Sequence, residues 1–391
     1  MKTQANARHA IEYVVLLSFS IIAIYIRYLG RNVLSNDFRS CLTSWYQELV
    51  AAGPGIDSLL SYTGDYSMPY VFIIWLLSKL PVSFLYSIKV VSMCFDFGLA
   101  VIVGKIVAYL NPKNNYSFCW GYCVTLMIPN VFLNSSYWGQ CDAIYIFFLM
   151  AAFLCCLQKR YTLVMILFGV ALSFKLQSIF LLPFLLIVYW FKKEFSALQF
   201  MLVPVVMFIM NIPAMIAGYS PKIMVTAYIR QASGYPWLYY FYPNLYFFFQ
   251  GRPYYLFSTG AIMLAITVLL VFVVLMVKKE IIPDQDNMLP ILTWTAYTCV
   301  FFLPSMHERY GYLAEIAAVI YGLINIRKLW VAAGMILCIF PKYLYALDLT
   351  GNSYAMQTAT AIGNTCVYMA FTCVIWHQLF EGERRTVHAE D

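Results

Sequence analysis

The amino-acid sequence predicts an all-α polytopic membrane protein with about twelve transmembrane helices, in a single integral membrane domain over residues 1–391. Two observations lead to this prediction. Of the 391 residues, 62% are hydrophobic and only 11% are charged, whereas a soluble domain carries roughly 25% charged residues. In addition, every adjacent pair of basic residues stands where an apolar run ends: Lys159-Arg160, Lys192-Lys193, Lys278-Lys279, Arg327-Lys328 and Arg384-Arg385.

The basic pairs also predict the orientation of the chain. Basic loops are retained on the cytoplasmic side during insertion, so the pairs mark one face of the membrane. The first apolar run, from Ile11, is followed by no small-residue cleavage site, which favours a permanent span over residues 11–29 instead of a signal peptide. Both termini are therefore expected in the cytoplasm.

The first loop on the opposite face, residues 31–83, is long and polar. It contains Asp37, Asp65 and a short amphipathic piece around Trp45. The apolar stretch 69–80 is too short to cross a hydrocarbon core of about 30 Å at 1.5 Å per residue, so we expect a juxtamembrane or re-entrant helix there.

The remaining apolar runs predict the other spans in order. Residues 161–190 must leave and re-enter the cytoplasmic face between two basic pairs, so we expect two short helices with a polar break near Lys175. A second external loop, rich in Tyr and Pro, is predicted over residues 218–255. The other predicted spans are 84–109, 117–134, 139–157, 196–217, 256–277, 289–303, 310–324, 329–346 and 358–380.

Several classes of protein are disfavoured by the same sequence. The net charge of +7 arises from single or paired cations at span ends, without the continuous basic patch of a nucleic-acid-binding protein. The eleven cysteines show neither metal-ligand spacing nor a disulfide framework. No phosphate-binding loop or nucleophile elbow occurs.

Three carboxylates are predicted on the external face. Asp37, Asp65 and Asp142 fall in loops or at a span end on that side, where grouped carboxylates can supply a general base or hold a divalent cation. Asp142 follows Trp138 and Gln140, and a structural partner for it is an equally good interpretation.

Two sets of cations fall in unexpected places. Lys175 lies in an apolar stretch close to Gln177, which suggests an anionic ligand such as a phosphate, although an interfacial lysine is the alternative. The tight external turn His307-Glu-Arg-Tyr310 holds three ionisable groups where the topology does not call for basic residues, which suggests a phosphate or a neighbouring acid as their partner. The alternative is that Glu308 and Arg309 pair with each other or with Asp142. Asp96 and Glu315, inside predicted spans, are expected to make structural hydrogen bonds.

In their order along the chain, several motifs resemble those of the GT-C superfamily of polytopic glycosyltransferases, above all its bacterial mannosyltransferase-like branch. The resemblance covers most of the chain. The motifs are Asp37, Gly64-Asp-Tyr-Ser-Met-Pro-Tyr70, Asn134-Ser-Ser-Tyr-Trp-Gly-Gln-Cys-Asp142, Ala171-Leu-Ser-Phe-Lys-Leu-Gln177, Arg230-Gln-Ala-Ser-Gly-Tyr-Pro236 and Met306-His-Glu-Arg-Tyr310.

The resemblance implies an inverting glycosyltransferase of the bacterial cytoplasmic membrane, with its active site on the outer face. The donor would be a polyprenyl-phosphate-linked sugar and the acceptor a lipid-linked or cell-envelope glycan. Asp37 would be the catalytic base, and Lys175, His307 and Arg309 would bind the donor phosphate. Substrate binding or structural support would come from Asp65, Trp138, Gln140, Asp142, Gln177, Arg230, Glu308 and Tyr310.

The resemblance is incomplete at the first motif. Only one acid occurs in Asn36-Asp37-Phe-Arg39, where some relatives have an Asp-X-Asp pattern, so the sequence assigns no metal. A different class of function is a secondary transporter or flippase for an anionic lipid or sugar phosphate, with Lys175 at a broken helix. The clustering of ionisable residues on one face and the lack of an internal repeat disfavour this alternative.

Overall fold

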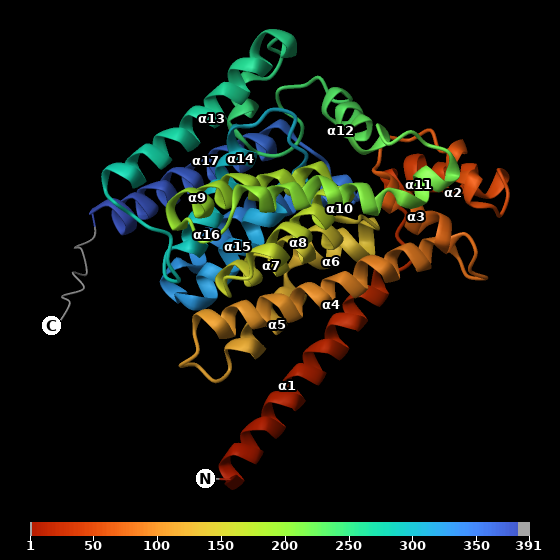
Figure 1. Cartoon of the computed structure of the whole chain (residues 1–391). Helices are drawn as coiled ribbons and strands as arrows, with labels where there is room; N and C mark the ends of the chain where they lie inside the picture. Colours follow the sequence, from red (N-terminus) through yellow and green to blue (C-terminus); the bar gives the residue numbers. More distant parts are fainter. Residues whose placement is uncertain (1, 382–391) are drawn as a thin grey trace.

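The computed structural model describes residues 2–381 and is helical throughout that range, without any strand (Figure 1). Five helices are long and apolar enough to cross a membrane, as expected for an integral membrane protein. They are α1 (Lys2–Leu29, apolar from Ala10), α4 (Phe84–Leu110), α13 (Tyr254–Lys278), α16 (Leu329–Ala346) and α17 (Tyr354–Trp376).

The prediction of twelve full-length spans is wrong, because most of the other apolar segments form shorter helices. A helix of 15 residues, the length of α14, extends only about 22 Å, less than the roughly 30 Å of a hydrocarbon core. The shorter helices are α5 (Ser117–Met127), α7 (Asp142–Leu157), α8 (Tyr161–Phe174), α9 (Leu182–Lys192), α10 (Leu202–Met210), α14 (Met288–Phe302) and α15 (Tyr312–Ile324).

Chain breaks and burial explain the short helices. The predicted span 117–134 is interrupted where Pro129 begins the one-turn helix α6 (Pro129–Phe132), and the span 196–217 is divided at Asn211, before α11 (Ile212–Ala217). Helices α7, α14 and α15 are buried along nearly their whole length. Protein surrounds them, so their length is not set by the thickness of a lipid bilayer.

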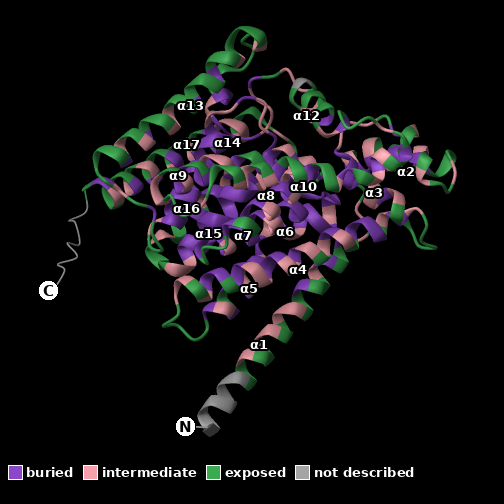
Figure 2. Ribbon diagram, in the orientation of Figure 1, coloured by how far each residue is buried: buried purple, intermediate pink, exposed green. Residues whose placement is uncertain are grey.

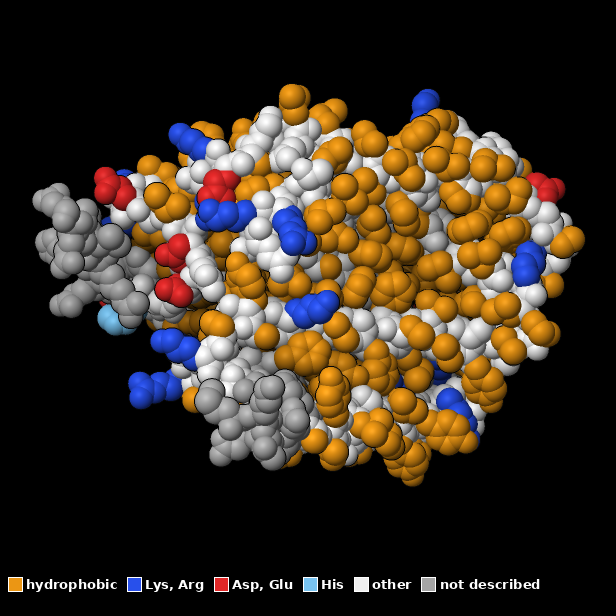
Figure 3. All heavy atoms as spheres, turned by 60° about the horizontal axis from the view of Figure 1, so that its bottom comes forward, with side chains coloured by type: hydrophobic (Ala, Val, Ile, Leu, Met, Phe, Trp, Pro, Cys, Tyr) orange, Lys and Arg blue, Asp and Glu red, His pale blue; other side chains and the backbone are white. Residues whose placement is uncertain are grey.

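The outer helices are far more exposed than these central ones (Figure 2). Only 11% of the apolar window of α1 and 22% of that of α13 are buried. Hydrophobic side chains cover most of the surface seen in Figure 3, while charged side chains gather mainly at its left-hand edge. This distribution suits helices that face lipid.

The expected break at Lys175 is present. Helix α8 ends at Phe174, and Lys175 has an extended backbone (φ −154°, ψ 135°) before the turn η4 (Leu176–Leu181) leads into α9. Residues 161–192 therefore form two short helices with a polar break, and the break places Lys175 inside the bundle.

Loops gather at two ends of the bundle. At one end, Lys159 contacts Glu194 (3.0 Å), and Lys192 donates a hydrogen bond to the carbonyl of Pro283 (3.1 Å). The predicted basic pair at 384–385 lies outside the described residues.

The opposite end holds the segment between α1 and α4, on the right-hand side of Figure 1. This segment contains the turn η1 (Phe38–Leu42), helix α2 (Thr43–Ala51), the turn η2 (Ile56–Ser61) and helix α3 (Met68–Leu77). Helix α3 is short, as the apolar stretch 69–80 predicted. The second predicted loop contains α12 (Ile223–Ser233) and the turn η6 (Leu245–Phe249), and the turn η7 (Glu308–Gly311) follows α14.

Candidate active site

The loop that carries Asp37 is anchored by a buried lysine of α4. Lys89 is 2% exposed, and its ammonium donates hydrogen bonds to the carbonyls of Gly30 (2.9 Å) and Val33 (2.7 Å). Carbonyls at the end of a helix lack intrahelical partners, so Lys89 satisfies groups that α1 leaves free and fixes the path of the chain toward Asp37.

Replacement of Lys89 is expected to destabilise this loop. Lys89→Met leaves the carbonyl of Gly30 with only the backbone N–H of Val33 (3.1 Å) and removes the lysine donor of the Val33 carbonyl, which should lower the free energy of unfolding by about 2 kcal/mol. Thermal unfolding in detergent measures the effect. The matched control is Lys105→Met, since Lys105 is an exposed residue of the same helix. Equal midpoints for the two variants would contradict the anchoring role of Lys89.

Asp37 is held through one of its two carboxylate oxygens. Its Oδ2 accepts hydrogen bonds from Trp138 Nε1 (3.0 Å) and Gln140 Nε2 (2.5 Å), so these donors do not engage Oδ1. Between them, Gly139 has φ +79°, a left-handed conformation that turns the chain so that both neighbours face Asp37. The Asp37 side chain is 37% exposed. A part-exposed carboxylate with a free oxygen can accept a proton from a bound hydroxyl.

Asp142 and Lys175 form a buried ion pair. The Asp142 side chain is fully buried, and its Oδ2 also accepts a hydrogen bond from Asn134 Nδ2 (2.8 Å). The rings of Tyr66, Tyr145 and Tyr310 each lie 5.7 Å from the Lys175 ammonium. The structural partner considered for Asp142 is therefore Lys175.

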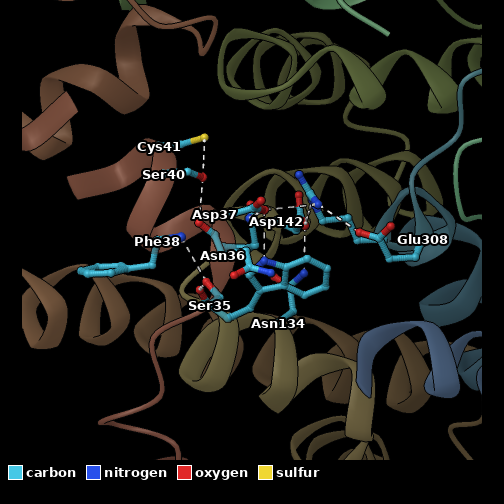
Figure 4. A network of polar contacts seen from close by, with 12 residues as sticks. Ser35, Asn36, Asp37, Phe38, Ser40, Cys41, Asn134, Asp142 and Glu308 are labelled. Carbon is cyan, nitrogen blue, oxygen red and sulfur yellow. Dashed lines mark hydrogen bonds and ion pairs between the residues drawn. The ribbon is translucent and has the colours of Figure 1, made fainter. Parts of the chain in front are cut away.

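Arg309 joins these two parts of the site. Its Nη1 donates to Glu308 Oε1 (3.1 Å) and lies 3.6 Å from Asp37 Oδ2, while its Nε lies 3.5 Å from Asp142 Oδ2. The three carboxylates, of Asp37, Asp142 and Glu308, are labelled in Figure 4, and each lies within 3.6 Å of the guanidinium group of Arg309. The group also lies 5.2 Å from the ring of Trp138. Side chains from distant parts of the sequence thus form one cluster of charges.

His307 lies in a cage of tyrosine rings next to the cluster. Its ring centroid is 4.6 Å from Tyr235, 4.3 Å from Tyr240 and 4.8 Å from Tyr310. Burial, with the nearby charges of Arg309 and Lys175, holds the pKa of His307 well below its usual range. The imidazole is therefore neutral near pH 7 and offers a ligand a hydrogen bond instead of a positive charge.

A small polar pocket opens onto the cluster. Its lining includes Asp37, Asp65, Gln140, Tyr235 and Arg309. Asp37 and Asp65 are the carboxylates in this lining that could contact a divalent cation. Within residues 2–381, no group of three or more His, Cys, Asp or Glu side chains is arranged to hold a metal.

A larger apolar cavity adjoins this pocket, and Tyr235 lines both. Its volume is about 290 Å³, and Tyr310 and Gln177 lie in its wall. The remaining lining is largely apolar and includes Leu176, Ile179, Phe180, Ile262, Leu303 and Met306. The cavity brings a hydrophobic space next to the charged cluster.

Some buried polar atoms around the cluster have no hydrogen-bond partner: Arg309 Nε, His307 Nε2 and Gln177 Oε1. Unsatisfied buried polar groups are costly and rare in proteins, and they often mark a place where a ligand or water binds. Their position beside the ion pairs indicates a site built for a polar group of a ligand.

The other predicted residues lie outside the central cluster. Gln231 of α12 donates a hydrogen bond to the carbonyl of Asp65 (2.9 Å), whereas Arg230 is exposed on α12 and is not part of the cluster. Asp96 pairs with Arg27 (2.9 Å), and Glu315 accepts a hydrogen bond from Asn130 (2.8 Å). These last two acids make structural contacts, in line with the sequence-based expectation.

Sequence reasoning missed several residues of the site. Lys89 and Lys342 are cations in apolar helices, the same signal that drew attention to Lys175. Tyr66 and Tyr235 lie inside the quoted motifs 64–70 and 230–236, but nothing distinguished them as site residues among the 32 tyrosines of the chain. A comparison with protein-family models and with curated proteins found no match for this chain.

Proposed function

We propose that this protein is an inverting glycosyltransferase that moves a sugar from a polyprenyl-phosphate donor to a lipid-linked or cell-envelope glycan acceptor. The observation that carries the proposal is the arrangement of Asp37. This part-exposed carboxylate lies within 3.6 Å of the buried guanidinium of Arg309, at one polar end of a membrane-embedded bundle. A proton acceptor and fixed cations thus lie in one site.

The chemical step follows from this arrangement. The acceptor hydroxyl attacks the anomeric carbon, and its proton passes to Asp37. The bond between the anomeric carbon and the phosphate oxygen breaks, and the electron pair leaves with the lipid phosphate. Arg309 and Lys175 stabilise the charge that develops on the departing phosphate, and His307 donates a hydrogen bond to it. Direct displacement inverts the configuration at the anomeric carbon.

The apolar cavity supports a lipid-linked donor. It shares Ala232 and Tyr254 with an open surface pocket that also involves Ile229, Pro236 and Tyr255. This pocket lies between α12 and the exposed helix α13. A prenyl chain can therefore remain among apolar side chains while its phosphate reaches Tyr310 and Arg309. The resemblance of the sequence motifs to GT-C enzymes points to the same donor class.

The proposal places the site on the outer face of the bacterial cytoplasmic membrane. We expect Thr63→Cys, in the segment between α1 and α4, to react with a membrane-impermeant maleimide in intact cells. Lys113→Cys, between α4 and α5, should react only after permeabilisation. Both positions are exposed, and the unsubstituted chain gives the background labelling of the native cysteines. The opposite pattern would overturn the orientation.

The activity itself can be tested with the purified protein in lipid. A panel of polyprenyl-phosphate sugars and nucleotide sugars is offered with a lipid-linked glycan acceptor, and release of lipid phosphate or nucleotide is followed. We expect lipid phosphate release together with a glycosylated acceptor. Accumulation of an anionic lipid or sugar phosphate in vesicles, without any glycosyl product, would instead support a transporter or flippase.

A further inference from the structure

The cluster of charges that we propose to bind the donor phosphate contains more carboxylates than cations. Asp37, Asp142 and Glu308 each lie within 3.6 Å of Arg309, and Asp142 also pairs with Lys175. Both side chains of this ion pair are buried. A bound phosphate must therefore compete with carboxylates for Arg309, and the structure indicates which contact is exchanged.

Of the contacts that Arg309 makes with Asp37, Asp142 and Glu308, the one with Glu308 is a hydrogen bond. Arg309 Nη1 lies 3.1 Å from Glu308 Oε1, whereas the guanidinium lies 3.6 Å from Asp37 and 3.5 Å from Asp142. Arg309 Nε remains without a hydrogen-bond partner. The guanidinium is thus only partly satisfied by the protein, and its firmest partner is Glu308.

Glu308 can give up this partner because other groups surround it. It is 4% exposed at the start of η7. Besides Arg309, the groups that interact with it electrostatically are Asp37, Lys342 and Tyr343 of α16, and Tyr239, Tyr240 and Tyr310. Lys342, buried on the neighbouring helix, donates its hydrogen bond to Asn352 Oδ1 (3.4 Å) and interacts with Glu308 only electrostatically, so Glu308 keeps a basic side chain in its surroundings when Arg309 moves.

We propose that Glu308 is a built-in competitor of the donor phosphate, which occupies Arg309 in the empty site and yields it when the phosphate binds. The inference rests on the proposed function and adds a residue that limits donor affinity. The same competition helps the product lipid phosphate to leave, because Glu308 recovers Arg309 as the phosphate departs. Glu308 acts through Arg309 and is a positioning residue.

The direct test is the affinity for a short-chain prenyl phosphodiester, a probe with one fixed negative charge. We expect Glu308→Gln to bind this probe roughly fivefold or more tightly than the wild type at pH 7.5, since the amide removes a negative charge close to the phosphate. The matched control is Glu315→Gln, a buried carboxylate whose hydrogen bond goes to Asn130 instead of Arg309. Its affinity should equal that of the wild type.

The wild type gives a second test that needs no substitution. Burial raises the pKa of the Glu308 carboxyl above its usual range. As the pH falls through that pKa, Glu308 becomes neutral and stops competing, so the affinity for the phosphodiester should rise toward acid. The probe itself does not titrate. In Glu308→Gln this pH dependence should be lost.

Turnover provides a further readout. Glu308→Gln should lower both KM for the donor and kcat, because a tighter phosphate site also releases the product more slowly. Unchanged or weaker probe binding in Glu308→Gln, or an unaltered pH dependence, would show that Glu308 does not compete with the phosphate for Arg309 and would overturn the inference. If the wild type binds no prenyl phosphodiester at all, both this inference and the proposed function are contradicted.

Discussion

Asp37→Asn is expected to abolish glycosyl transfer without weakening donor binding. The amide carbonyl can still accept one of the hydrogen bonds from Trp138 or Gln140, so the shape of the site is kept. The amide cannot take the proton of the acceptor hydroxyl. Loss of a general base typically costs about 10²- to 10⁴-fold in rate. Single-turnover kinetics with saturating donor, beside a binding measurement with the phosphodiester probe, separates the two effects.

The neighbouring carboxylate provides the comparison. Asp65 lines the same pocket, and Asp65→Asn is expected to cost much less in rate than Asp37→Asn. The reverse order of the two variants would move the base to Asp65. Equal activity of both variants and the wild type would leave the proposed mechanism without a base.

The exposed, lipid-facing parts of the fold could be predicted from the sequence. The predicted spans 84–109, 256–277 and 329–346 match α4, α13 and α16 within two residues, because hydropathy records the contact of these helices with lipid. The central helices α7 and α15 lie within three residues of the predicted spans 139–157 and 310–324, but they are too short to be the full membrane spans that the sequence predicted. They are packed among other helices, where an apolar sequence reports burial in protein and sets no minimum length.

The candidate site was predictable as a set of residues but not as a set of contacts. A charged residue in an apolar stretch is costly, and this cost made Lys175 visible in the sequence. Nothing in the sequence shows that it pairs with Asp142, 33 residues away, or that Arg309 lies between Asp142 and Asp37. Such pairings depend on how the helices pack, which one sequence does not encode in any local pattern.

Removal of either cation of the cluster is expected to slow the chemical step sharply. Negative charge develops on the lipid phosphate as the glycosidic bond breaks, and fixed cations stabilise that state more than the ground state. Lys175→Ala and Arg309→Ala should each lower the rate by about 100-fold or more, by analogy with the removal of one oxyanion donor. Arg309→Lys should recover part of this loss, because it keeps the charge without the planar fork of donors.

The Lys175→Ala variant needs a control for stability, because Lys175 belongs to a buried ion pair. Lys175→Ala alone leaves the buried Asp142 with only Asn134 and the more distant Arg309 (3.5 Å) as partners, and removal of one member of a buried ion pair typically costs about 3–5 kcal/mol of folding free energy. Lys175→Met combined with Asp142→Asn removes both charges and should restore the thermal stability. If Lys175 stabilises the departing phosphate, the double variant remains slow although it is folded and stable. Recovery of wild-type turnover in that double variant would show that Lys175 serves only to neutralise Asp142, and Arg309 would then be the remaining phosphate-binding cation of the proposed site.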